Sequence, residues 1–197
     1  MLLPRAYGGE EVDHVTWFRA MEALAKLDAS TAWCVGQING CAVAAASVAP
    51  QVARRIWGEP RAALSWGPPV RSRADEVEGG HRLSGEWMMS SGSRHATWIG
   101  LMAPVFDSSG APVTLSGGAT LRIFLVPASQ VEWIENWDVI GLVATITSVF
   151  VAVVLRTFPF TWPPTAWYSG VGFVGVAVTT AIAIRSEEHT SELQSQR

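Results

Sequence analysis

The sequence predicts an α+β fold with a helical N-terminal part, a central antiparallel β-barrel or sandwich, and the start of a C-terminal helical bundle. Two observations carry this prediction. Apolar residues recur at helical spacing in the first part of the chain, and from Arg61 onward Gly, Pro and Ser separate short β-prone runs. We therefore expect a partial helical domain over 1–58, a β domain over 59–157 and the first helix of a bundle over 158–184.

Three helices are expected in the first part. Asp13 can cap the first helix, and Asp28 or Ser30 can cap a second one that is rich in Ala and Gly and reaches about residue 47. Pro50 suits the first turn of a short third helix, which Gly58 would end. The strands expected after these helices are 63–67, 82–89, 97–105, 120–126 and 132–139.

Charge and cysteine content limit the classes of partner. The net charge is −3 and no basic block occurs, which gives no electrostatic basis for nucleic-acid binding. Cys34 and Cys41 are seven residues apart on the expected second helix, so their Cα atoms would lie roughly 10 Å apart, too far for a disulfide. We expect two buried thiols in a reducing compartment. The first residues lack the apolar core of a signal peptide, which predicts a cytoplasmic protein.

The last third of the chain leaves an alternative open. Residues 139–155 and 158–184 carry no charge, so a membrane hairpin over 139–184 would make this a non-enzymatic, membrane-anchored protein. The first run is short for a span and Pro163-Pro164 divides the second, which favours buried elements. Residues 185–195 resemble the translation of a DNA-sequencing adapter, so 185–197 is expected to be an artefactual tail without function.

Four segments, taken in order, resemble the acyl-CoA dehydrogenase superfamily. They are LPRAYGG at 3–9, LDASTAW at 27–33, GGHRLSGEWMMSSG at 79–92 and WDVIGL at 137–142. The resemblance implies a helical domain, an antiparallel β domain and a C-terminal bundle, with a flavin in the cleft between the last two. It also implies that the sequence is truncated at both ends and that the catalytic base, a Glu or a His, belongs to a bundle that this chain lacks. The chain alone is therefore expected to be inactive.

The branch of the superfamily rests on one motif. Dehydrogenases carry Thr-Asn or Ser-Asn where this chain has Ser90-Ser91-Gly92, and the motif with its following His-Ala-x-Trp is more similar to two-component flavin monooxygenases that hydroxylate aromatic rings. That similarity implies FAD or FMN reduced by a partner flavin reductase, a C4a-hydroperoxide formed with O₂, a small aromatic or polycyclic substrate, and a homotetramer. The alternative is a dehydrogenase that oxidises the Cα–Cβ bond of an acyl-CoA.

The same resemblance suggests site residues. Ser91 is the candidate for contact with flavin N5 and the peroxide, because a short hydroxyl at a strand end can reach that edge. Trp87 would pack against the ring system, and Gly92 would let the backbone approach without a Cβ clash. The predicted cofactor-binding residues are Trp87, Ser90, Ser91, Gly92 and Thr145, the predicted substrate-binding residues are Trp33 and Trp98, and no metal ligand is predicted.

Each of these residues also has a plainer interpretation. Ser90 and Ser91 could be ordinary strand-end hydroxyls, Trp33 could serve helix packing, and Trp87 and Trp98 could belong to a core. The apolar run 143–155 departs from the family pattern, and a reading-frame slip there would put Thr145 in doubt. Elsewhere, His81 is interpreted as a surface residue, and Asp75, Glu76 and Glu78 as solvated loop charges.

Overall fold

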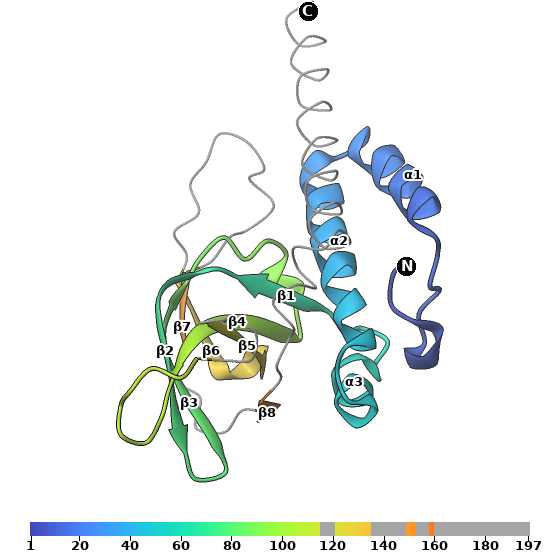
Figure 1. The fold of residues 1–197 in the computed structure, drawn as a ribbon. Helices are drawn as coiled ribbons and strands as arrows, with labels where there is room; N and C mark the ends of the chain where they lie inside the picture. The colour runs from blue at the N-terminus through green and yellow to red at the C-terminus, as the bar shows by residue number, and fades with distance from the viewer. Residues whose placement is uncertain (115–120, 135–148, 153–157, 160–197) are drawn as a thin grey trace, which may run out of the picture.

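The computed structural model describes residues 1–114, 121–134, 149–152 and 158–159. Three helices lie on one side of the molecule and a curled β-sheet lies on the other, with the second helix facing the sheet (Figure 1). The helices are α1 (His14–Ala25), α2 (Ala29–Ala42) and α3 (Pro50–Trp57), and short 3-10 turns are η1 (Arg5–Tyr7), η2 (Val43–Ala46), η3 (Ser93–His95) and η5 (Ala128–Gln130).

The helices begin where their capping residues predict. The Asp13 carboxylate accepts hydrogen bonds from two N–H groups in the first turn of α1, each at 3.0 Å. Asp28 accepts one from the N–H of Thr31, so Asp28 rather than Ser30 caps α2. Pro50 occupies the first turn of α3, and Gly58 is its C-cap. α2 ends earlier than predicted, because the chain tightens into η2 after residue 42.

Within the described residues, eight strands form one curled sheet. Its order is β6-β7-β3-β2-β4-β5-β8, and β1 pairs with β4 outside this path. The strands are β1 (Leu64–Gly67), β2 (Pro69–Val77), β3 (Gly80–Trp87), β4 (Trp98–Phe106), β5 (Leu121–Pro127), β6 (Val131–Ile134), β7 (Val149–Ala152) and β8 (Phe158–Pro159). β8 pairs with β5 at two positions.

The sheet is mixed, which corrects the expectation of an antiparallel one. β1 runs parallel to β4 along its whole length, and β2 pairs in parallel with β4 at two positions. The other pairings are antiparallel. The β2–β3 hairpin separates β1 from β4 in the sequence, so the chain comes back to β4 in the same direction as β1. Turn residues in a sequence can indicate an antiparallel hairpin, but no comparable pattern indicates that β1 and β4 pair in parallel.

Strand β2 was not predicted, because its sequence is rich in charge. The strand is nevertheless central, with β3 on one side and β4 on the other. Asp75 is therefore not a solvated loop charge. Its side chain is 18% exposed and forms ion pairs with Arg73 on its own strand and with Arg82 on β3. Arg71 and Glu86 form a second cross-strand ion pair. Facing opposite charges on neighbouring strands replace the apolar alternation that predicts a strand.

The sheet separates two hydrophobic clusters. Alternate residues of β4, from Ile99 to Val105, are fully buried on the inner face, where they meet Trp87 and Phe124. We call this cluster the inner core; it comprises Ala74, Leu83, Trp87, Ile99, Leu101, Ala103, Val105, Phe124, Val126 and Val131. The outer face packs on α2, η2 and α3 in a cluster that we call the helix–sheet core: Cys41, Ala44, Ala45, Val48, Ala53, Ile56, Trp57, Leu64 and Leu125.

His81 lies inside the protein, which corrects its interpretation as a surface residue. It is 6% exposed, and its ring meets the Phe124 ring edge-on at 5.2 Å between centroids. The Arg122 guanidinium lies 3.1 Å from His81 Nε2. Because a guanidinium can only donate, Nε2 must accept, and the imidazole is neutral with its proton on Nδ1. Burial first, and then the Arg122 charge, lower the pKa of His81 below its ordinary value of 6.5.

This buried imidazole predicts a loss of stability in acid. A lowered folded-state pKa means that the native state binds fewer protons than the unfolded chain. The contribution of His81 to the free energy of unfolding is therefore fully present above pH 6.5 and is lost as the pH falls through the folded-state pKa. Each pH unit between the two pKa values is worth about 1.4 kcal/mol. The variant His81→Gln keeps an acceptor for Arg122 and does not titrate. Urea unfolding across this pH range should show a shallower acid loss in the variant; identical profiles would contradict the prediction.

The apolar run 139–184 lies largely outside the described residues. The parts that are described, β7 and β8, are strands within the sheet. None of the helices in the described part of the chain has both the length and the apolar character needed to cross a bilayer.

Candidate functional site

A short loop follows β3 and packs against both α2 and β1. We call residues 88–93 the serine loop. Its Ser91 Oγ lies 2.8 Å from the indole Nε1 of Trp33 on α2. Its backbone is tied to β1, because Ser65 Oγ donates a hydrogen bond of 2.9 Å to the Ser91 carbonyl. The structure therefore brings together predicted residues that lie up to 58 positions apart in the sequence.

The two serines of the motif have different environments. Ser90 is fully buried, and its Oγ lies 3.1 Å from Oγ of Ser65, which is itself 1% exposed. Ser91 is half-buried, so of the two serines it is the one with a part exposed to solvent. Ser90 thus belongs to the support of the loop, and Ser91 is the candidate for ligand contact.

Gly92 allows the loop to approach α2 closely. Its φ of +75° lies in the left-handed region, and a Cβ there would stand 3.2 Å from Ile38 Cδ1 and 3.6 Å from Cys34 Cβ. The predicted close approach at Gly92 is therefore made to the helix. Met89 also has a positive φ, 55°, an unusual conformation for a side chain of this size. Met88 and Met89, which precede the two serines in the loop, are 40% and 59% exposed.

Trp87 occupies the inner core rather than a ligand surface. Its side chain is 0% exposed, and its Nε1 donates a hydrogen bond of 2.8 Å to the Met102 carbonyl. In this structure no part of the indole is open to a flavin ring. Trp98 is half-buried and packs against the helix–sheet core. Thr145, the remaining predicted contact, lies outside the described residues.

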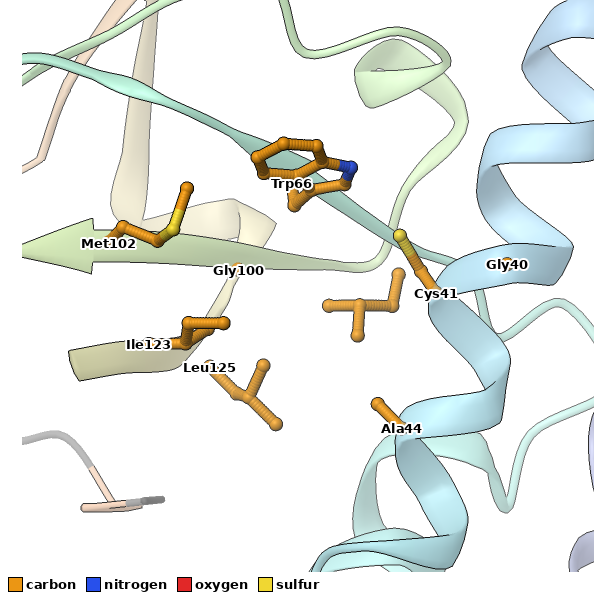
Figure 2. Close-up of a pocket in the computed structure, with 9 residues that line it drawn as sticks. Gly40, Cys41, Ala44, Trp66, Gly100, Met102, Ile123 and Leu125 are labelled. Atoms are coloured by element: carbon orange, nitrogen blue, oxygen red, sulfur yellow. The ribbon is translucent and has the colours of Figure 1, made fainter. Parts of the chain in front are cut away.

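A separate apolar pocket opens between α2 and the outer face of the sheet (Figure 2). Gly40 and Cys41 line it from α2 and Ala44 lines it from η2, while Trp66, Met102, Ile123 and other residues line it from the strands. Leu64 and Trp66 face this pocket, and the intervening Ser65 bonds to the serine loop. The cavity volume is about 30 Å³, room for one or two waters and far less than the several hundred Å³ of a typical ligand pocket.

Neither of the two cysteines forms a disulfide, and both are buried. Burial raises the pKa of Cys34 to about 11 and that of Cys41 to about 12. At pH 8 a pKa near 11 leaves roughly one thiol in a thousand as the reactive thiolate. We expect no measurable reaction with a thiol reagent such as DTNB in the folded chain at pH 8, and two reactive thiols per chain in urea. A thiol that reacts rapidly before unfolding would contradict this expectation.

Sequence reasoning missed Ser65, which holds both serines of the motif. The available signal was one polar residue within the apolar run Leu64–Gly67, and that pattern is too common to indicate a role. Its partners lie 25 and 26 residues away, so only the tertiary structure reveals the contact. Among the described residues, no three His, Cys, Asp or Glu side chains converge as a metal site would require.

Comparison with known proteins shows which family the chain resembles. The chain is 32% identical over 150 residues to the oxygenase component of FADH₂-dependent resorcinol hydroxylase from Rhizobium sp. MTP-10005, covering 75% of this chain and 35% of that protein. It is 33% identical over 147 residues to the flavin-dependent monooxygenase oxygenase subunit HsaA of Mycobacterium tuberculosis, covering 74% and 35%. The chain is homologous to the oxygenase components of two-component flavin-dependent hydroxylases. It spans about a third of the length of these curated relatives.

Solved structures show the same fold for this oxygenase homologue. XiaF from Streptomyces sp., solved with FADH₂ and glycerol, superposes with a TM-score of 0.79 at 24% identity, over 94% of this chain and 50% of that one. The 3-HSA hydroxylase from Rhodococcus sp. RHA1 gives 0.68 at 29% identity, over 81% and 39%. The fold is acyl-CoA dehydrogenase-like, which confirms the predicted α+β class. No family model matches the sequence.

Proposed function

We propose that this chain is part of the oxygenase component of a reduced-flavin-dependent monooxygenase that hydroxylates a small aromatic or polycyclic compound. The observation that carries the proposal is the serine loop, which holds the half-buried Ser91, bonded to Trp33, and two exposed methionines. The sequence similarity to hydroxylase oxygenase components supports the same function. A Ser-Ser-Gly motif in place of Thr-Asn favours a hydroxylase over an acyl-CoA dehydrogenase.

The residues of the serine loop fit a flavin. An isoalloxazine is a flat, largely apolar ring with a polar edge, and it needs both an apolar surface and a hydrogen-bond donor. Met88 and Met89 offer the first, and the Ser91 O–H offers the second. Reduced FAD or FMN, when bound, would supply two electrons, so that one atom of O₂ enters the substrate as a hydroxyl group and the other leaves as water.

The described residues would hold and shield this reaction. Ser91 would donate to the ring edge, and Gly92 would keep the loop close to α2. The buried Trp87 would support the loop from the inner core. Thr145 as a further cofactor contact and Trp98 as a substrate contact belong to the proposal as predicted from the sequence. So do a catalytic base supplied by a C-terminal bundle, a cytoplasmic location and the domain limits at residues 58, 157 and 184.

The proposed partners follow from the two-component chemistry. The flavin must arrive reduced, so a separate flavin reductase is the first partner. The second proposed partner is the protein itself, as a homotetramer, in keeping with the family that the sequence resembles.

The test uses a full-length oxygenase carrying this segment, together with a flavin reductase, NADH and either FAD or FMN. A panel of phenols and fused-ring phenols is offered under ¹⁸O₂. We expect a hydroxylated product that carries one ¹⁸O atom, with formation that requires the reductase. Bleaching of oxidised flavin by an acyl-CoA without oxygen, and no labelled product from the panel, would overturn the proposal in favour of a dehydrogenase.

A further inference from the structure

The direction of the hydrogen bond at Ser91 is fixed by its partner. An indole Nε1 can only donate, so in the 2.8 Å contact with Trp33 the Ser91 Oγ must accept. A serine hydroxyl has one proton to donate, and no other described group bonds to the Ser91 hydroxyl. Trp33 thus donates to a lone pair of Ser91 Oγ, and the O–H of Ser91 stays available to donate to another acceptor.

The backbone beneath Ser91 is held by an ordered chain of hydroxyls. Ser65 Oγ donates its single proton to the Ser91 carbonyl at 2.9 Å. In the 3.1 Å contact between Ser65 Oγ and Ser90 Oγ, the donor must therefore be Ser90. The chain runs from Ser90 to Ser65 to the Ser91 carbonyl, and both Ser90 and Ser65 are buried. An unpaired buried hydroxyl costs folding free energy. These hydrogen bonds therefore favour the loop conformation in which all of them form.

We infer that Trp33 and Ser65 are positioning residues that orient the Ser91 hydroxyl as a hydrogen-bond donor to the edge of a bound reduced flavin. Trp33 sets the direction of the hydroxyl, and Ser65 fixes the backbone that carries it. Trp33 then acts through Ser91 rather than by contact with the substrate, which differs from the role predicted from the sequence. The inference rests on the proposed function for its ligand, but the hydrogen bond itself can be tested without any ligand.

The first experiment examines the 197-residue chain by ¹H–¹⁵N NMR of its indole groups. Trp33→Phe identifies the Trp33 signal among those of the ten tryptophans. Ser91→Ala should move that signal upfield, because the indole loses its acceptor, whereas Ser91→Thr should keep it close to its original position. An indole signal that is unchanged by Ser91→Ala would overturn the inference, whatever the flavin does.

The second experiment measures the affinity of a full-length oxygenase carrying this segment for reduced flavin in the absence of oxygen. Loss of one oriented hydrogen bond predicts a dissociation constant about tenfold higher for Ser91→Ala and for Trp33→Phe. The double variant should be no weaker than Ser91→Ala alone, because both changes remove the same donor. Trp33→His should restore part of the affinity, since imidazole Nε2 stands at the ring position of indole Nε1 and can donate.

A matched control separates orientation from packing. Trp17 on α1 is 4% exposed, and its Nε1 has no hydrogen-bond partner among the described residues. Trp17→Phe therefore removes similar ring volume without removing a hydrogen bond, and we expect an unchanged affinity for reduced flavin. If Trp33→Phe fails to fold, Trp33→His carries the test, and an affinity of Trp33→His for reduced flavin no higher than that of Ser91→Ala would overturn the inference.

The outcomes distinguish this inference from the proposed function. If Ser91→Ala weakens flavin binding and Trp33→Phe does not, the positioning role fails and the proposed function stands. If the unaltered protein binds no reduced flavin, the proposed function fails, and the orienting role fails with it even where the NMR result confirms the hydrogen bond.

Discussion

Gly85→Ala is expected to lower the free energy of unfolding by about 3 kcal/mol or more, because two independent costs combine. Gly85 has a φ of +149°, a region that residues with a side chain rarely adopt. An added Cβ would also stand 2.3 Å from the Arg71 carbonyl oxygen and 2.7 Å from the Ser72 Cα, both on the neighbouring strand β2. These atoms are backbone, so they can move only if the pairing of β2 with β3 changes.

The position coincides with an irregularity of that pairing. The register between β2 and β3 shifts between Pro69 and Arg71, opposite the end of β3 where Gly85 lies. Urea unfolding followed by tryptophan fluorescence would measure the loss. Gly79→Ala is the matched control, since Gly79 also has a positive φ, +77°, but a Cβ there meets nothing within 4 Å. We expect about 1 kcal/mol for the control, and equal losses for the two variants would contradict the clash.

The elements that the sequence predicted well are those that depend on neighbouring residues. Asp13 and Pro50 act within one turn of the helices that they begin, so local chemistry was enough to locate α1 and α3. Strand β2 was missed, because partners of its charged residues lie on another strand. Arg71 meets Glu86 fifteen residues later, and no local pattern shows that pairing.

The candidate site was predictable to the same extent. The motif around Ser91 was recognisable as a contiguous stretch, and Ser91 is half-buried in the structure, while its contact with a flavin stays a prediction. The groups that orient it come from α2 and β1, and their spacing along the chain carries no information about contact. His81 was misread for a related reason, because its partner Arg122 comes from β5, 41 residues later, and no local pattern shows that contact.

Trp87→Ala is expected to cost about 3–5 kcal/mol of folding free energy, the usual loss for a large aromatic residue in a close-packed interior. Trp87 is 0% exposed within the inner core, and its indole donates to the Met102 carbonyl at 2.8 Å. The variant would leave both a cavity and a carbonyl without this donor. Thermal and urea unfolding of the chain should show the loss, and a variant as stable as the unaltered chain would contradict the core role.

Trp87→Phe separates that core role from contact with a cofactor. Phenylalanine keeps much of the ring volume but lacks the N–H, so a loss of about 1–3 kcal/mol is expected from the Met102 carbonyl alone. Affinity for reduced flavin, measured in a full-length oxygenase carrying this segment, should stay within twofold, in contrast to about tenfold for Ser91→Ala. A large fall in affinity with unchanged stability would instead show that the ring stacks on the flavin. Because the indole has no exposed surface, that result would require the inner core to open when the cofactor binds.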